Sequence, residues 1–128
     1  MKKVAAGTPW GSVVGYSRAV LAGNTIAVAG TTAAGADGSV EGEDDMYAQA
    51  RIAFGRIIAA LEELGASASD VVRTRMFVSD IDRWEEVARA HGEVFRGIDP
   101  AATMVEVSRF IDPRMLIEIE ADAVIAEP

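Results

Sequence analysis

The fold of this chain is decided near its C-terminal end, by the stretch Leu116-Ile-Glu-Ile-Glu-Ala121 and the preceding segment Ala102-Thr-Met-Val-Glu-Val-Ser-Arg109. In the later stretch, Ile and Glu alternate with the period-two pattern of a strand that buries one face. We therefore expect two closing strands, at about residues 102–109 and 115–125. Glu118 and Glu120 should share one face of the last strand, and Glu106 lies in the strand before it.

Two short apolar runs near the N-terminus predict a β-hairpin. Arg18–Leu21 and Thr25–Ala29 flank Gly23 and Asn24, two residue types that tolerate positive φ. The following segment, residues 30–42, contains several glycines and few large side chains, so it is predicted to be a loop.

A helix and a strand are predicted next. Asp44 or Asp45 can cap a helix that runs to Leu64, where Gly65 ends it, and apolar residues recur within it at spacings of three and four. The β-branched and large apolar residues of Val71–Val78 then predict a strand.

A second helix is predicted after this strand. Asp82 with Glu85 three positions later has the spacing of a capping box, and Gly97 with Pro100 ends the helix. Its inner face is expected to carry the following residues: Trp84, Val87, Ala88, His91, Val94 and Phe95.

The order of these elements predicts an α+β fold in which two helices cover one face of a mixed sheet. The sequence shows no composition shift and no internal repeat, so residues 1–128 are expected to form a single domain. The alternation in the last strand leaves the opposite face of the sheet in need of solvent or a partner, which favours an oligomer.

Composition limits the compartment and the partners. The 128 residues include no Cys, which fits a cytoplasmic protein, and no apolar run is long enough to span a membrane. Twelve Lys and Arg against twenty Asp and Glu give a net charge of −8, which disfavours binding to nucleic acid. We therefore expect neither a membrane nor a nucleic-acid partner.

The residues that commonly carry catalysis or bind metals are scarce. His91 is the only histidine, no serine lies in a Gly-x-Ser-x-Gly elbow, and no His or Cys pair has a zinc-binding spacing. The sequence thus predicts neither a metal nor an organic cofactor. His91 itself is expected to be packed or hydrogen-bonded in the interior rather than catalytic.

Glu118 and Glu120 allow two interpretations. They can belong to a solvated strand face that protects the sheet from aggregation. Alternatively, a carboxylate beside apolar walls can hold a raised pKa and exchange protons with water. The spacing alone does not choose between these.

Four separated segments resemble the RidA/YjgF family, also called YER057c/UK114 or endoribonuclease L-PSP. Gly15-Tyr-Ser17 resembles its N-terminal Gly-x-Tyr-Ser element, and Asp70–Asp80 resembles its Val-x-x-Thr-x-Phe-x-x-Asp strand. Val105–Arg109 and Ile117–Ala121 resemble its closing strands. The resemblance implies a chorismate-mutase-like fold with a six-stranded sheet, assembled as a homotrimer with a small-molecule cleft at each subunit interface.

The resemblance also implies an activity and site residues. Deaminases of the family hydrolyse enamines or imines to a carbonyl compound and ammonia. Glu118 matches the carboxylate that activates water, and Tyr16 matches a tyrosine that lines the pocket. The arginine that pairs with the substrate carboxylate falls at Ala102, and the small or Cys residue two positions on falls at Met104.

Losing that arginine removes a charge-assisted interaction of about 1.5–3 kcal/mol. Ala102 and Met104 would then form a neutral wall that favours a more apolar ligand. Among the other arginines, Arg75 is the candidate for the cleft, because a mid-strand arginine needs a partner or an open cleft. Arg18 is expected to face solvent.

Three functions follow from the resemblance, and the replaced arginine leaves open whether catalysis is retained. The first is an imine or enamine deaminase of altered specificity, with Glu118 as general acid and base and Tyr16, Ala102, Met104 and Arg75 around the ligand. The second is a non-catalytic trimer that binds a small molecule or a protein. The third, a ribonuclease, is disfavoured by the acidic composition and by the lack of a His/Lys pair.

Overall fold

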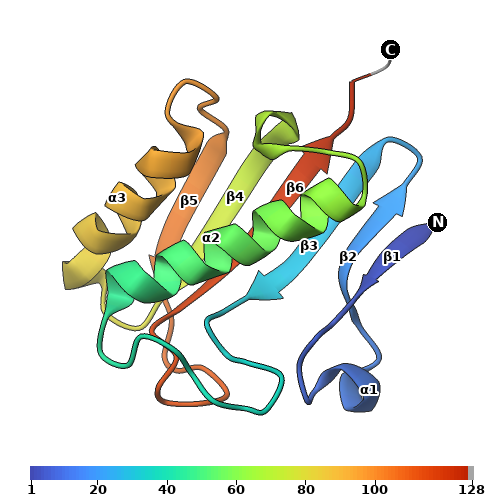
Figure 1. The fold of residues 1–128 in the computed structure, drawn as a ribbon. Coiled ribbons are helices and arrows are strands. Elements are labelled where there is room, and N and C mark those ends of the chain that lie inside the picture. Colours follow the sequence, from blue (N-terminus) through green and yellow to red (C-terminus); the bar gives the residue numbers. More distant parts are fainter. Residues whose placement is uncertain (127–128) are drawn as a thin grey trace.

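A computed structural model, which describes residues 1–126, contains one six-stranded sheet with two long helices on the same face (Figure 1). The strand order is β1-β2-β3-β6-β4-β5. β4 and β5 run parallel, whereas the other neighbouring pairs are antiparallel, so the predicted α+β class and mixed sheet are confirmed. The strands are β1 (Lys2–Ala5), β2 (Ser17–Ala22), β3 (Thr25–Thr31), β4 (Val71–Val78), β5 (Ala101–Glu106) and β6 (Ile117–Val124).

The N-terminal region contains the predicted hairpin and two elements that were not predicted. β2 and β3 pair around Gly23, which has φ +62°. β1 forms the edge of the sheet beside β2, and the short helix α1 (Gly11–Val14) follows it. Both are four residues long. Segments of this length carry little periodic signal, and β1 owes its hydrogen bonds to distant β2.

Helix α2 (Met46–Glu63) begins and ends as predicted. The Asp45 side chain accepts a hydrogen bond from the Ala48 backbone N–H at 2.9 Å, and Gly65, at φ +86°, follows the C-terminal residue Leu64. Its buried stripe packs on the sheet through Phe54, Ile57 and Leu61. Within residues 1–126, no helix is both long enough and apolar enough to cross a lipid bilayer.

Helix α3 (Trp84–Phe95) begins later than predicted, and the prediction that Asp82 and Glu85 form its capping box is wrong. The chain first forms a 3₁₀ turn at Ile81–Arg83, capped by Asp80, whose carboxylate accepts from the Asp82 N–H at 3.0 Å. Asp82 is therefore held inside the turn and cannot cap the helix. Trp84 is the first helical residue and is 50% exposed, so it does not belong to the inner face.

The sheet face turned away from the helices carries charged side chains in a regular register. Arg75 on β4 lies opposite Glu120 on β6, and its Nη1 atom is 3.6 Å from Glu120 Oε1 and 3.3 Å from Asp122 Oδ2. Two positions along, Phe77 lies opposite Glu118. Within a single chain, most of this face is covered by neither helix (Figure 1).

Candidate functional site

Glu118 lies on β6, on the face opposite the core, because its neighbours Ile117 and Ile119 are fully buried under the helices. Its carboxylate rests against the backbone of Gly30 on β3. A Cβ atom built at Gly30 would lie 2.1 Å from Glu118 Oε2, far closer than real Cβ contacts. Only glycine leaves room for this carboxylate position. Gly30 belongs to β3 rather than to the predicted loop.

A cavity of about 310 Å³ opens beside Glu118. Its polar side chains are Tyr16 and Arg18, with the hydroxyls of Thr8 and Thr32. Its apolar walls are Trp10, Ile111 and Met115. A mainly apolar hollow with a few convergent polar groups is the usual form of a small-molecule site.

Glu118 is half-buried. Among residues 1–126, its carboxylate forms no ion pair and accepts no hydrogen bond. Burial raises the pKa of Glu118 above the ordinary 4.5, the negative charge of Glu120 raises it further, and the positive charge of Arg18 opposes both effects. A carboxylate with a raised pKa is a stronger base, and its protonated form can return the proton to a ligand.

Arg18 forms part of this wall, which corrects the expectation that it faces solvent. Its Nη1 donates to the Gly30 carbonyl at 2.7 Å and to Thr31 Oγ1 at 3.0 Å. Its Nε and Nη2 donate to the Ala6 carbonyl at 3.3 and 3.1 Å, and Nη2 also donates to the Tyr16 hydroxyl at 3.3 Å.

These contacts occupy all of the donors of Arg18, because a guanidinium carries five N–H groups. The acceptors are all neutral, so the positive charge remains uncompensated except by Glu118 across the cavity. Arg18 therefore acts through its field and through the groups that it positions. It has no free N–H pair to form a fork with a ligand carboxylate.

The Tyr16 hydroxyl lies between two of these groups. It is 2.5 Å from Thr8 Oγ1 and accepts from Arg18 Nη2, while the Arg18 guanidinium lies 5.6 Å from the centre of its ring. The phenol is thus fixed at the rim of the cavity that Glu118 closes. A fixed hydroxyl there can orient a polar atom of a ligand.

The segment that supplies Ile111 and Met115 is anchored by a buried amide. Gln49 of α2 donates to the Arg114 carbonyl at 2.9 Å and accepts from the Leu116 N–H at 2.9 Å. Arg114 in turn pairs with Asp112 at 2.7 Å, which lowers the pKa of Asp112 to about 2. Hydrogen bonds to α2 therefore hold the segment that forms the apolar wall in place.

Comparison with known proteins identifies the family to which this fold and cavity belong. The sequence model of the endoribonuclease L-PSP family matches residues 8–125, which is nearly the whole chain. The chain belongs to the RidA/YjgF family. The prediction from the four sequence segments is thereby confirmed.

Several similar proteins match this chain over nearly their full length. The Streptomyces coelicolor protein SCO2049 is 39% identical over 123 residues, covering 96% of this chain and 91% of that protein. The crystal structure of Rv2704 from Mycobacterium tuberculosis, a member of the YjgF/YER057c/UK114 family, is 48% identical with a TM-score of 0.87 and covers 97% of this chain and 98% of that one. The Escherichia coli YjgF structure is 31% identical with a TM-score of 0.82, at the same coverage.

The structure brings together only some of the residues that the RidA/YjgF resemblance suggested. Glu118 and Tyr16 line the same cavity. Ala102 and Met104 pair with the buried Thr74 and Met76, so they lie on the helix-covered face of edge strand β5. Within one chain they do not reach Glu118, and their place at an intersubunit cleft stays a prediction.

Arg75 lies on the same sheet face as Glu118 but lines a different hollow. It lines a shallow hollow with Tyr16 and Ser17, and its guanidinium is paired with Glu120 and Asp122. Arg75 does not line the Glu118 cavity. Its role toward a ligand stays a prediction.

Sequence reasoning missed two residues that shape the site. Arg18 lies two positions after Tyr16, and this spacing can place two side chains on the same side of an extended segment, so a signal was present. Gly30 gave none, since its requirement arises from a carboxylate far along the chain. The third carboxylate, Glu106, has a separate role, because it accepts a hydrogen bond from the Ile81 N–H at 3.0 Å.

His91 lies outside the site and is packed in the interior as expected. Its Nε2 atom is 2.9 Å from Thr74 Oγ1, and its ring lies against Phe54 and Phe95 at centroid distances of 5.5 and 4.7 Å. Burial lowers the pKa of His91. The Glu118 cavity therefore contains no histidine.

Proposed function

We propose that this chain folds as one domain over residues 1–128 and forms a RidA-like homotrimer. We propose that the homotrimer hydrolyses enamines or imines at the Glu118 cavity, with a substrate specificity that differs from that of the family's deaminases. Residues 127 and 128 of that domain lie outside the described part. The observation that carries the proposal is an unpaired, half-buried carboxyl with a raised pKa, held over Gly30 beside a fixed tyrosine hydroxyl. Family membership supports the processing of a small molecule.

The proposed reaction balances with Glu118 as the only proton carrier. The carboxylate accepts a proton from water as the water oxygen attacks the carbon of the protonated C=N group, which gives a neutral carbinolamine. The protonated carboxyl then donates this proton to the amine nitrogen. The C–N bond breaks as the carboxylate takes the proton of the carbinol hydroxyl, so ammonia leaves with the carbonyl product and the carboxyl afterwards releases its proton to water. An enamine enters the same route after tautomerising to its imine.

The surroundings of Glu118 favour an apolar and weakly anionic substrate. The donors of Arg18 are already occupied, so a substrate carboxylate finds no guanidinium fork within the chain. Trp10, Ile111 and Met115 offer an apolar surface instead. Aryl or alkyl imines fit this cavity better than 2-iminoacids.

The homotrimer is part of the same proposal. The open sheet face offers a surface for other subunits, and the family resemblance implies that Ala102 and Met104 lie at a cleft between them. We also propose a cytoplasmic location. Sedimentation velocity of the purified chain tests the assembly, and a monomer at micromolar concentration would contradict it.

Hydrolysis of two imines in parallel tests the activity. Benzophenone imine is neutral and apolar, and its hydrolysis releases benzophenone and ammonia; freshly generated iminopyruvate carries a carboxylate. We expect acceleration of the first, a weaker effect on the second, and loss of both in Glu118→Gln. Faster hydrolysis of iminopyruvate would overturn the specificity argument.

The same assay distinguishes the alternative of a binding protein without catalysis. A compound that raises the melting temperature of the chain and is recovered unchanged would support binding alone. Ribonuclease activity is disfavoured, because the cavity holds a carboxylate with no His or Lys beside it and the chain carries a net charge of −8. RNA cleavage that disappears in Glu118→Gln would reverse this view.

A further inference from the structure

A second cavity, of about 270 Å³, lies on the other side of Arg18 from Glu118. It occupies the space between α2 and the N-terminal edge of the sheet, where β1 and β2 extend beyond the helix (Figure 1). Arg18, Thr8 and Thr32 line both cavities. The second cavity takes no part in the chemistry proposed for Glu118.

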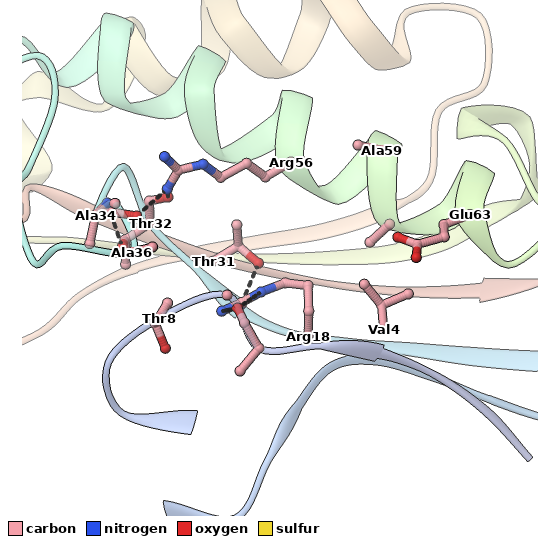
Figure 2. Close-up of a pocket in the computed structure, with 14 residues that line it drawn as sticks. Val4, Thr8, Arg18, Thr31, Thr32, Ala34, Ala36, Arg56, Ala59 and Glu63 are labelled. Carbon is pink, nitrogen blue, oxygen red and sulfur yellow. Dashed lines mark hydrogen bonds between the residues drawn. The ribbon is translucent and has the colours of Figure 1, made fainter. Parts of the chain in front are cut away.

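Two guanidinium groups line this cavity from different elements. Figure 2 shows Arg56 reaching from α2 toward the segment of Thr32 and Ala34, and Arg18 lying on the sheet side. Arg56 Nη1 donates to the carbonyls of Thr32, at 2.8 Å, and Ala34. Within residues 1–126, neither arginine forms an ion pair.

Arg56 also keeps free donors. Its Nε and Nη2 atoms have no hydrogen-bond partner among residues 1–126, although Nη1 holds the side chain in place. Nε and Nη2 form one edge of the guanidinium, and such an edge binds a carboxylate through two parallel hydrogen bonds. Arg56 is therefore a positioned cation with an unused fork.

The rest of the wall is mostly apolar. Val4, Ala59 and Ala60 line it, and Glu63 is its only carboxylate among the described residues. Glu63 lies seven positions after Arg56 on α2, which corresponds to about 10 Å along the helix axis. The Arg56 end of the cavity thus combines positive charge with small apolar side chains.

We propose that this cavity is a second ligand site, which takes a small aliphatic monocarboxylate with its carboxylate on Arg56 and its chain against Val4 and Ala59. The two positive charges exclude an organic cation. A fully hydrated inorganic anion would leave the apolar wall uncovered, which disfavours phosphate. The volume suits a chain of a few carbons.

Titration of the ¹⁵N-labelled full chain with butyrate, at constant ionic strength, tests this site. We expect saturable shifts at the amides of Ala59, Ala60 and Val4, and no comparable shifts with butyramide, which has a similar shape but no charge. Arg56→Gln should weaken butyrate binding about tenfold or more. Arg51→Gln is the matched control, because Arg51 lies on the same helix outside the cavity, 5.7 Å from the Tyr47 ring.

A second pair of variants keeps the test decisive if Arg56→Gln fails to fold. Ala59→Leu fills the cavity while keeping both arginines and should abolish binding, whereas Glu62→Leu places the same side chain on α2 outside the cavity. The proposal is overturned by any of four results: no saturable shifts, equal binding of butyramide, tighter binding of inorganic phosphate, or shifts confined to residues around Glu118. Because the readout is binding and not hydrolysis, failure here leaves the Glu118 proposal standing.

Discussion

Glu118 and Glu120 lie two positions apart on β6 and point to the same face of the sheet, yet their surroundings differ. Glu120 is 3.6 Å from the Arg75 guanidinium on an accessible surface. Among residues 1–126, Glu118 has no such partner, and burial raises its pKa. The cation nearest to Glu118, Arg18, is already saturated by neutral acceptors. Two neighbouring outward positions of one strand thus differ: Glu120 is paired with a guanidinium, whereas burial raises the pKa of Glu118.

Exchanging each carboxylate for an amide gives the largest expected contrast. Glu118→Gln should lower kcat/KM for benzophenone imine roughly 10²–10⁴-fold, because the amide cannot carry a proton. Glu120→Gln should change it less than about threefold, since an exposed ion pair contributes little. Initial rates of benzophenone release measure both. Equal losses in the two variants would remove the distinction.

Gly30 tests whether the position of Glu118 matters. Gly30→Ala places a methyl group where the Glu118 carboxylate lies, so the side chain must move. Because the glutamate side chain is flexible, we expect only a small loss of unfolding free energy, together with a clear fall in activity. Chemical denaturation and the imine assay provide the two measurements.

Gly55 is the matched control for this substitution. It lies in α2, and an added Cβ would meet no atom within 4 Å. Gly55→Ala should therefore stabilise the chain by about 0.5–1 kcal/mol through helix propensity and leave activity unchanged. A Gly30→Ala variant as active as Gly55→Ala would show that the close packing has no functional value.

Arg18 separates the effect of charge from that of positioning. Arg18→Met removes the positive charge that opposes the rise in the pKa of Glu118, so the pH midpoint of activity should move upward. Arg18→Lys keeps the charge but loses the fork to Ala6 and Gly30, so it should lower the melting temperature with a smaller shift of the midpoint. A pH–rate profile of each variant decides the matter, and identical midpoints would exclude an electrostatic role.

The raised pKa of Glu118 also predicts the pH dependence of stability. The folded chain holds this proton more tightly than the unfolded chain does, so the contribution of Glu118 is favourable at low pH. Stability is lost as pH rises from the ordinary 4.5 through the raised value. The melting temperature of Glu118→Gln, relative to the parent, should therefore rise between pH 4 and 8. A constant difference across this range would contradict the assignment.

The ion pairs that Glu120 and Asp122 of β6 form with Arg75 give the smallest expected effect on stability. Arg75→Gln breaks the ion pairs of Arg75 with Glu120 and Asp122. The side chains of all three residues are more than one-third exposed to solvent. The unfolding free energy should fall by less than about 1 kcal/mol, and the loss should shrink further in high salt. Urea denaturation at two salt concentrations measures this. A loss above about 2 kcal/mol would contradict this expectation, because it would be the cost of breaking a buried ion pair rather than an exposed one.

Features that depend on residues close together in the sequence could be predicted, whereas features that depend on contacts between distant segments could not. Strand β4 and helix α2 were placed closely, because alternation, caps and apolar stripes are local signals. The start of α3 was missed because Asp80 captures the Asp82 N–H one turn earlier. The spacing of the two glutamates could not distinguish Glu118 from Glu120, and only the family resemblance did, since the physical difference depends on Gly30 and Arg18 from distant strands.

The contact between Gly30 and Glu118 also constrains how this site can change over evolutionary time. As long as position 118 carries a glutamate in this rotamer, any side chain at position 30 collides with it. A substitution at position 30 therefore forces residue 118 out of this rotamer, whereas a shorter residue at position 118 would leave position 30 free to vary. Positions 30 and 118 are thus expected to change together among relatives, which can be checked from sequence alone.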